Sequence, residues 1–313
     1  MAEIVVTGCA GFIGSQIAEA CLANGDSVRG VDLLTDYYDI AQKQSNLARL
    51  LEHSAFEFVQ TDIADASDEV LDGAEVVYHQ AGQPGVRSSW RTQFDDYMSR
   101  NVKATQRLLE AATQLGVGRV VYASSSSVYG NADHYPVDES MRPQPFSPYG
   151  VTKLAGEHLC SLYAANFGLA VVSLRYFTVY GPGQRPDMAT HRLFEAALNQ
   201  TAFPLFGSGA QLRDFTYVGD IVRANLLAAT ADVEPGLVAN IAGGGECSMI
   251  DLIAMVEDVT GHPILLDHRA AERGDVARTG ALTDRARERL GWEPLVGLRE
   301  GLERQHEWHL SRR

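Results

Sequence analysis

The fold is decided by the stretch IVVTGCAGFIG, residues 4–14, in which an apolar β-branched run leads directly into a segment rich in glycine. The apolar residues that follow recur at helical spacing, so Gly8, Gly11 and Gly14 lie in a turn between a strand and a helix. Glycines in this pattern permit a tight turn, close approach of a pyrophosphate and close packing of the helix. The helix N-terminus adds free N–H groups that favour the same anion.

Outward from this turn, short β-branched runs alternate with helical patterns. Strands are predicted at residues 4–6, 27–31, 56–60, 76–79, 120–123 and 171–176. Strands that alternate with helices form parallel sheets with right-handed crossovers. The sequence therefore predicts an α/β fold, with a Rossmann-type doubly wound parallel sheet in residues 1–177. A chain return around 213–242 and a smaller C-terminal α/β domain, mainly residues 178–313, complete the prediction.

Composition narrows the classes of partner. The chain of 313 residues carries 26 Lys and Arg against 40 Asp and Glu, a formal charge of -14, which disfavours binding to nucleic acid. No apolar run reaches the roughly 18 residues that a membrane span needs. The four cysteines are widely spaced and form no cluster with histidine, so we expect a reduced protein without a metal site. The N-terminus lacks the pattern of a secretory signal, which favours the cytoplasm.

An acid follows the second predicted strand at the position that a dinucleotide site requires. Asp32 lies 18 residues after Gly14, where its carboxylate can accept from a ribose 2′-hydroxyl and repel a 2′-phosphate. NAD is therefore favoured over NADP. Each of the segments that follow the first four predicted strands is, taken singly, more often an ordinary turn. Together they predict a cofactor site of Gly8, Gly11, Phe12, Ile13, Gly14, Asp32, Asp62, Ile63, Gln80, Ala81 and Gly82.

A second group of residues has the chemistry of a general base. Tyr149 and Lys153 are four residues apart and share one face of a helix. We expect the lysine ammonium to lower the pKa of the phenol, which makes Tyr149 a credible base. Ser124, Ser125, Ser126 and Ser127 follow a strand, and one of these hydroxyls can share the proton. The alternatives are a surface pair and a solvated turn.

The chain resembles the extended short-chain dehydrogenases/reductases, specifically the nucleotide-sugar epimerases and dehydratases, nearly end to end. Besides the glycine-rich turn, the matching motifs are NVKAT (101–105), SSSVYG (125–130), YGVTK (149–153), RYF (175–177), RDF (213–215), GDV (274–276) and LGWEP (290–294). The resemblance implies that Tyr149 is the base, that Lys153 is its electrostatic partner and binds the cofactor ribose, and that Ser125 or Ser126 is the hydroxyl partner. It also implies that Asn101, Ser124 and Tyr176 contact NAD, and that helices near 91–115 and 148–167 form a homodimer.

The residues after the catalytic hydroxyl distinguish the reactions of this family. The dehydratases carry an Asp-Glu pair there, because elimination needs an added acid and base, and the decarboxylases typically carry Glu at the position of Ser127. This chain has Ser126 and Ser127 instead. Epimerisation at C4 of the sugar needs neither carboxylate and is favoured over UDP-glucuronate decarboxylation and dTDP-glucose 4,6-dehydration. A simple dehydrogenase and a non-catalytic NAD-binding scaffold are further alternatives.

Four segments resemble the UDP-glucuronate 4-epimerases in particular: DYYD (36–39), GVRS (85–88), FTVYGP (177–182) and QRPDMA (184–189). In that subgroup an arginine at the position of Arg185 holds the sugar carboxylate, as a guanidinium can do bidentately. The alternative is a UDP-glucose 4-epimerase, with Arg185 in a surface ion pair. A departure at Glu272, where the family often has arginine, puts one phosphate contact in doubt. The expected substrate-binding residues are Arg87, Ser125, Ser126, Ser127, Tyr149, Thr178, Arg185, Arg213 and Arg273.

Overall fold

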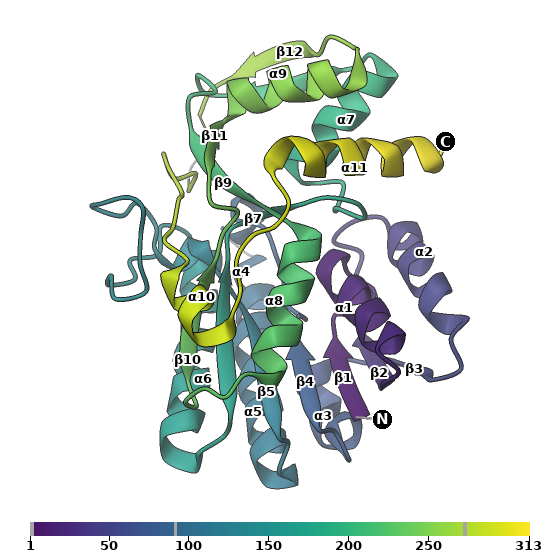
Figure 1. Cartoon of the computed structure of the whole chain (residues 1–313), viewed down its shortest axis with the longest axis vertical. Helices are drawn as coiled ribbons and strands as arrows, with labels where there is room; N and C mark the ends of the chain where they lie inside the picture. Colours follow the sequence, from purple (N-terminus) through teal and green to yellow (C-terminus); the bar gives the residue numbers. More distant parts are fainter. Residues whose placement is uncertain (1–2, 91–92, 272–273) are drawn as a thin grey trace.

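A computed structural model describes residues 3–90, 93–271 and 274–313 of the chain. Seven parallel strands form its central sheet in the order β3-β2-β1-β4-β5-β6-β10 (Figure 1). Their bounds are β1 Glu3–Thr7, β2 Ser27–Asp32, β3 Phe56–Gln60, β4 Val76–His79, β5 Arg119–Ser125, β6 Val171–Tyr176 and β10 Leu237–Ile241. The predicted strands and the doubly wound parallel sheet are confirmed.

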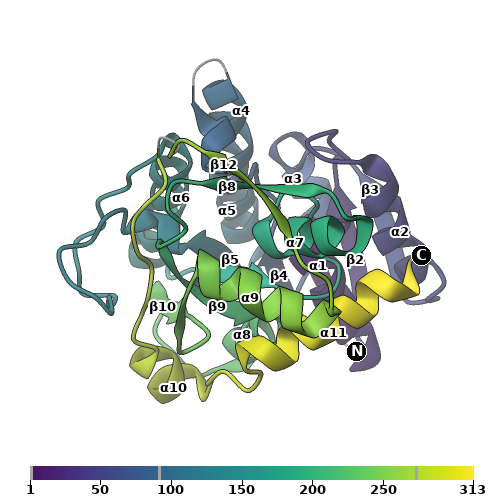
Figure 2. The same cartoon turned by 90° about the horizontal axis from the view of Figure 1, so that it is seen from above.

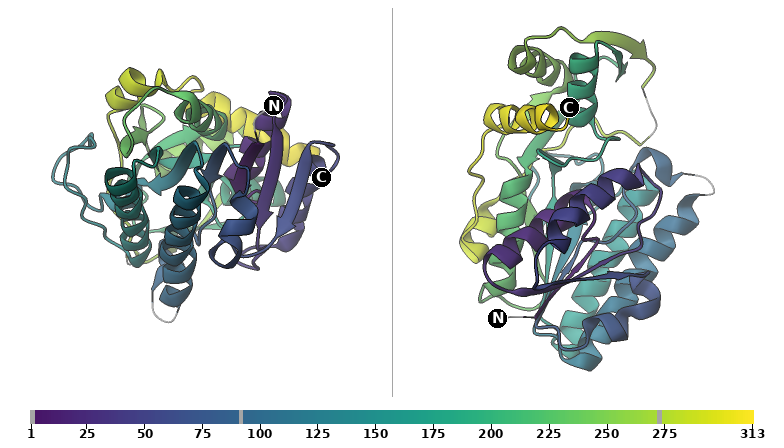
Figure 3. Two further views of the ribbon diagram at one scale, coloured as in Figure 1. Left: turned by 90° about the horizontal axis from the view of Figure 1, so that it is seen from below. Right: turned by 90° about the vertical axis from the view of Figure 1, so that its right-hand side faces the viewer.

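Helices cover both faces of this sheet (Figure 3), which is why its strands are apolar on both sides. Val5 packs toward one face and Val6 toward the other, and both are fully buried in separate core clusters. One face is covered by α1 (Phe12–Ala23), α2 (Ile40–Leu51) and α8 (Val218–Thr230). The opposite face is covered by α3 (Ile63–Leu71), α5 (Ala104–Leu115) and α6 (Pro148–Phe167).

A smaller group of elements lies at one end of the sheet (Figure 1). Strands β7 (Thr178–Tyr180), β9 (Leu212–Tyr217) and β11 (Glu246–Ser248) form one small sheet, and β8 (Ala202–Phe206) pairs with β12 (Leu265–Arg269). Helices α7 (Ala189–Asn199), α9 (Met249–Thr260) and α11 (Leu298–Ser311) complete it. Within the predicted chain return, β9 belongs to the small sheet, whereas α8 and β10 join the large one.

The remaining elements are short. They are η1 (Arg87–Ser89), α4 (Phe94–Tyr97), the π-helical turn η3 (Met98–Lys103), η4 (Ser126–Val128) and α10 (Asp284–Leu290), which packs beside β10 (Figure 2). Among the helices of the described residues, none has the length and apolarity needed to cross a membrane.

Candidate active site

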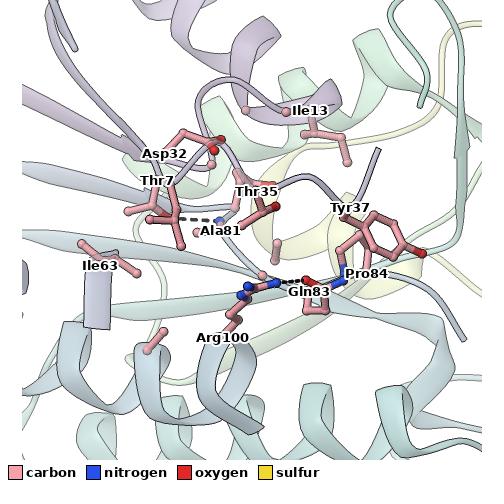
Figure 4. Close-up of a pocket in the computed structure, with 18 of the residues that line it drawn as sticks. Thr7, Ile13, Asp32, Thr35, Tyr37, Ile63, Ala81, Gln83, Pro84 and Arg100 are labelled. Atoms are coloured by element: carbon pink, nitrogen blue, oxygen red, sulfur yellow. Dashed lines mark hydrogen bonds between the residues drawn. The ribbon is translucent and has the colours of Figure 1, made fainter. Parts of the chain in front are cut away.

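The glycine-rich turn after β1 is pressed against the segment that follows β4. Gly8 has a φ of +71°, and a Cβ there would lie 2.8 Å from the backbone nitrogen of Ala81. A Cβ on Gly14 would lie 2.2 Å from the carbonyl oxygen of Gly8, so the helix packs on the turn only with glycine at this position. Thr7 Oγ1 accepts from Ala81 N over 3.1 Å, which ties the two segments together (Figure 4).

A cavity opens beside this turn, at the carboxyl ends of β1, β2, β4 and β5. The strand order reverses between β1 and β4, which is where ligands bind in open α/β sheets. Most of the residues expected to contact a cofactor line the cavity: Gly8, Gly11, Phe12, Ile13, Gly14, Asp32, Asp62, Ile63, Gln80, Ala81, Gly82, Ser124, Tyr149, Lys153 and Tyr176. The geometry therefore gathers into one cavity residues that lie up to 168 positions apart in the sequence.

Asp32 at the end of β2 is held by its surroundings. Its Oδ1 accepts from Leu34 N over 2.7 Å and its Oδ2 from Ala10 N over 3.2 Å. Lys43 Nζ lies 3.7 Å from Oδ1 and donates to Thr35 Oγ1 over 3.1 Å. Burial lowers the pKa of Lys43, and the nearby Asp32 carboxylate acts in the opposite direction. The carboxylate is thus fixed at the cavity wall.

Tyr149 enters the cavity from the first turn of α6. Ser147 caps this helix by accepting from Gly150 N over 3.1 Å, which sets the direction of the turn. The Ser125 hydroxyl, at the end of β5, acts to lower the pKa of the phenol, as does the charge of Arg185. Of the four serines, Ser125 is therefore the one whose hydroxyl acts on Tyr149.

The expectation that Lys153 lowers the pKa of Tyr149 is wrong, because Lys153 is not among the groups that influence this pKa. Desolvation is the largest influence and raises the pKa of Tyr149 above its ordinary value. Lys153 is itself buried, with Nζ 4.8 Å from the centre of the Tyr122 ring, and burial lowers its pKa to about 8. At neutral pH Lys153 is therefore still mostly protonated, but it loses its proton more readily than a solvated lysine does.

A buried ion pair lies behind the serines. Glu157 of α6 and Arg175 of β6 form a bidentate pair, with Arg175 Nε donating to Glu157 Oε2 over 2.9 Å. Ser124 Oγ donates to the same Oε2 over 2.8 Å. Arg175 Nη1 also donates to the Tyr129 hydroxyl over 2.7 Å. Hydrogen bonds on both partners reduce the cost of burying these charges and fix the end of β5 against α6.

Asn101, expected at the cofactor, does not line the cavity. Its Nδ2 donates to Gln83 O and to Thr152 Oγ1, each over 3.0 Å, and its Oδ1 accepts from Gln83 N over 2.7 Å. These contacts occupy the amide group, so Asn101 fixes the segment after β4 against α6 instead of facing a ligand.

Arg185 lines the same cavity as Tyr149, although it follows β7 in the smaller part of the molecule. Its guanidinium forms a bidentate pair with Asp187, at 2.9 Å from Nε and 3.0 Å from Nη2. Its side chain is 19% exposed. The arrangement places a cation next to the candidate base.

The other expected arginines gather outside this cavity. Arg87 Nη2 donates to Asp275 Oδ2 over 2.7 Å, and its guanidinium lies 4.2 Å from the centre of the Phe206 ring. Arg213 donates to the carbonyl oxygens of Leu212 and Val276 over 2.8 Å. Burial lowers the pKa of Arg213, and the charge of Asp275 acts in the opposite direction. Arg213 therefore makes neither of the ion pairs, with Asp214 or Asp220, that a purely structural role would predict.

Four further expected substrate residues are described and do not line the cavity: Ser125, which is buried, and Ser126, Ser127 and Thr178, which are half-buried. Arg273 lies outside the described residues. The sequence motifs do not include Arg192, whose pKa is lowered by burial and further by the charges of Arg87 and Arg269. Sequence reasoning also missed part of the cavity wall, which includes Thr35, Tyr37, Tyr38, Lys43, Thr61, Gln83, Pro84 and Arg100 (Figure 4). None of these belongs to a motif of its own, although Tyr37 and Tyr38 lie within the DYYD segment.

Comparisons with known proteins agree with this geometry. The model of the NAD dependent epimerase/dehydratase family matches residues 4–242. An uncharacterized UDP-glucose epimerase YtcB of Bacillus subtilis is 40% identical over 302 residues, 96% of this chain and 95% of that protein. A UDP-glucuronate 4-epimerase of Thermodesulfobacterium geofontis is 35% identical over 98% of this chain and 96% of its own length.

A solved structure extends the likeness to three dimensions. The UDP-glucuronic acid 4-epimerase of Bacillus cereus, in complex with UDP-glucuronic acid and NAD, superposes with a TM-score of 0.96. It is 40% identical in sequence, and the match covers 99% of this chain and 100% of that one. The family model spans far more than half of the sequence, and the relatives match nearly end to end. The chain belongs to the NAD dependent epimerase/dehydratase family.

Proposed function

We propose that the chain interconverts UDP-glucuronate and UDP-galacturonate by epimerisation at C4 through a transient 4-keto sugar. The observation that carries this proposal is the position of Arg185, which lines one cavity with Tyr149. A guanidinium there can bind the carboxylate at C6 while the phenol acts at C4. The names of the relatives from Thermodesulfobacterium geofontis and Bacillus cereus support the same substrate.

NAD fits the cavity beside the glycine-rich turn, because the N-terminus of α1 offers free N–H groups to its phosphates and Asp32 offers a carboxylate to a ribose. When bound, NAD supplies the acceptor and donor of hydride. Tyr149 removes the proton from the C4 hydroxyl, and Ser125, whose hydroxyl acts on the pKa of Tyr149, shares that proton. Lys153 contributes positive charge and binds the cofactor ribose. Ser124 and Tyr176 complete the wall.

The nucleotide diphosphate is assigned to the arginines between the two parts of the molecule. Arg87 and Arg213 supply charge to it, and Arg192 and Arg269 add to the field. In this assignment, residues 1–177 with the return through 213–242 hold NAD, and residues 178–313 mainly hold the nucleotide sugar. Ser126, Ser127 and Thr178 are placed around the sugar.

The carboxylate clamp has a chemical purpose beyond affinity. A 4-keto intermediate of glucuronate is a β-keto acid, which tends to lose CO₂. A guanidinium that holds the ionised carboxylate in a fixed orientation opposes that loss. Arg185 thus keeps the reaction an epimerisation.

A second candidate is a UDP-glucose 4-epimerase, which would use the same Tyr149 chemistry. One observation favours it: the Asp187 carboxylate already binds Arg185 bidentately and offsets its charge. In that case Arg185 has a structural role, and the C6 hydroxyl of a neutral sugar needs no cation.

The test is an NMR time course of the purified protein with UDP-glucuronate and, separately, with UDP-glucose, without added NAD. Formation of UDP-galacturonate is expected and would also demonstrate a retained cofactor. Formation of only UDP-galactose would transfer the assignment to the neutral sugar. NAD-loaded protein that converts neither sugar would support a scaffold.

We propose that the chain forms a homodimer through the apolar residues that α5 and α6 expose. Leu115, Val151, Leu162 and Phe167 are all exposed on these two helices. Light scattering is expected to give twice the chain mass, and Leu162→Glu with Phe167→Glu is expected to give monomers. The four cysteines are free and buried, which supports a reducing compartment, the cytoplasm.

A further inference from the structure

Helices α7 and α11 lie side by side (Figures 1 and 2), and together they bring two histidines and a glutamate close to one another. His191 and Glu195 are four residues apart on α7, and His309 comes from α11, 114 residues further along. Each side chain offers one ligand atom, and these atoms lie within 4.8 Å of one another. His309 Nδ1 lies 3.0 Å from Glu195 Oε1, and the centres of the His191 and His309 rings are 4.7 Å apart.

His309 is buried, and one of its nitrogens has no partner. The residue is 4% exposed, and its Nε2 is completely enclosed without a hydrogen bond. A buried polar atom without a partner costs about 1–3 kcal/mol. The hydrogen bond to Glu195 uses the other nitrogen, Nδ1, which is therefore the atom of His309 that can share an ion with the Glu195 carboxylate, whereas Nε2 points away from it.

His191 has the second contact that is typical of a metal-binding histidine. Its Nδ1 lies 2.8 Å from the carbonyl oxygen of Gln184. Histidines that bind metals usually donate their other ring N–H to a carbonyl or carboxylate, which fixes the tautomer and the orientation of the ring. In this arrangement the Nε2 of His191 keeps its lone pair for a ligand.

We propose that His191, Glu195 and His309 bind a divalent transition-metal ion of the zinc class, which joins α7 to α11. Two imidazoles and one carboxylate are a common zinc ligand set with a fourth position for water, and the Glu195 side chain is 44% exposed, so that position is open to solvent. Donor atoms of a tetrahedral zinc site lie about 3–3.5 Å apart, a spacing that small side-chain rotations can reach. Phe194 and Trp308 form the apolar surroundings.

The charges around the two histidines explain why the Glu195 carboxylate is needed to bind a cation. Arg312 and Arg313 influence the two histidines electrostatically and raise the cost of a cation. The carboxylate of Glu195 is therefore the ligand on which binding of the ion depends most. Because Gln184 directly precedes Arg185, the ion also holds the backbone that leads into the candidate active site. The site does not depend on which sugar the protein converts.

The experiment uses the full-length protein as purified, with its retained cofactor, after EDTA treatment and dialysis. We expect calorimetric titration with Zn²⁺ to give one ion per chain. Co²⁺ is expected to give the visible absorption of a tetrahedral nitrogen–oxygen site. Zn²⁺ is expected to raise the melting temperature, and EDTA to reverse the rise.

Variants separate this site from adventitious binding at the chain's other histidines. His191→Gln and Glu195→Gln are each expected to weaken Zn²⁺ binding by about tenfold or more. Glu195→Gln keeps an acceptor for His309 and therefore preserves the contact between the helices. His268→Gln on β12, at an exposed histidine, is the matched control and should bind as the parent does. Equal affinity in all three variants, or no stoichiometric binding by the parent, would overturn the proposal.

Discussion

The guanidinium of Arg185 and the carboxylate of Asp187 form a two-point ion pair at the wall of the cavity that also contains Tyr149. The pair fixes the plane of the guanidinium and leaves Nη1 free of Asp187. Arg185 acts to lower the pKa of Tyr149, so one arginine is connected both to the expected carboxylate of the substrate and to the base.

Removal of the Arg185 side chain is expected to affect the acid sugar selectively. In Arg185→Ala we expect the KM for UDP-glucuronate to rise at least about tenfold, because a charged hydrogen-bonded pair contributes about 1.5–3 kcal/mol. Some pentose product from decarboxylation should also form. Steady-state kinetics and NMR of the products measure both effects. Arg49→Ala, at an exposed arginine on α2, is the control, and unchanged kinetics in Arg185→Ala would remove this residue from the site.

Removal of the negative charge of Asp187 should shift the pH dependence of turnover. In Asp187→Asn the charge of Arg185 is no longer offset, so its lowering influence on the pKa of Tyr149 becomes stronger. A base must be deprotonated to act, so the acidic limb of the kcat profile is expected to move to lower pH. In Arg185→Ala the same limb should move to higher pH. Identical profiles for the parent and both variants would contradict this coupling.

Loss of the Tyr149 hydroxyl should abolish proton transfer without releasing the cofactor. We expect Tyr149→Phe to lower kcat by about 10²–10⁴-fold, the usual contribution of a positioned acid or base. Absorbance of the denatured protein's supernatant checks that NAD is retained. Tyr163→Phe, on the same helix and bonded to Glu110 and Gln106, is the matched control. Activity of Tyr149→Phe close to that of the parent would refute the base assignment.

Burial of the Lys153 ammonium should lower the free energy of unfolding, although the side chain is needed for function. Its pKa is lowered to about 8 from 10.5, so below pH 8 the folded protein carries a buried ammonium that the unfolded chain solvates. Stability therefore rises as the pH increases from 8 toward 10.5. Lys153→Met is expected to be more stable at pH 7, by up to about 3 kcal/mol, and inactive. Urea unfolding of the cofactor-free proteins at pH 7 and pH 10 measures this, and a gain that persists undiminished at pH 10 would argue against it.

The fold could be predicted because the sequence patterns that specify its strands and helices are local. The β-branched run at residues 4–6, the glycines after it and the alternation that follows each act within a few residues. The cavity wall near Asp32 was harder to predict from the sequence. Lys43 reaches the carboxylate from α2, and the sequence shows nothing that distinguishes it from a solvated lysine.

The rest of the site depends on tertiary packing. Asn101 lies in a motif that matches the family, yet its amide is occupied by Gln83 and Thr152. The direction of the pKa shift of Tyr149 follows from desolvation, which four-residue spacing does not reveal. His309 lies 114 residues from Glu195, so only the crossing of α7 and α11 makes them neighbours.

The path of the chain between its two parts limits how such enzymes can be recombined. Strand β10, at one border of the large sheet, is supplied by residues that follow the small sheet's β9, and α10 returns once more to pack beside it. A cut after residue 177 would leave β6 with an unpaired edge, and unpaired edges invite aggregation. A chimaera that exchanges sugar specificity must therefore transplant several separate segments and keep residues 218–241 with the parent sheet. Grafting a single contiguous half would divide one hydrophobic core between two unrelated sequences.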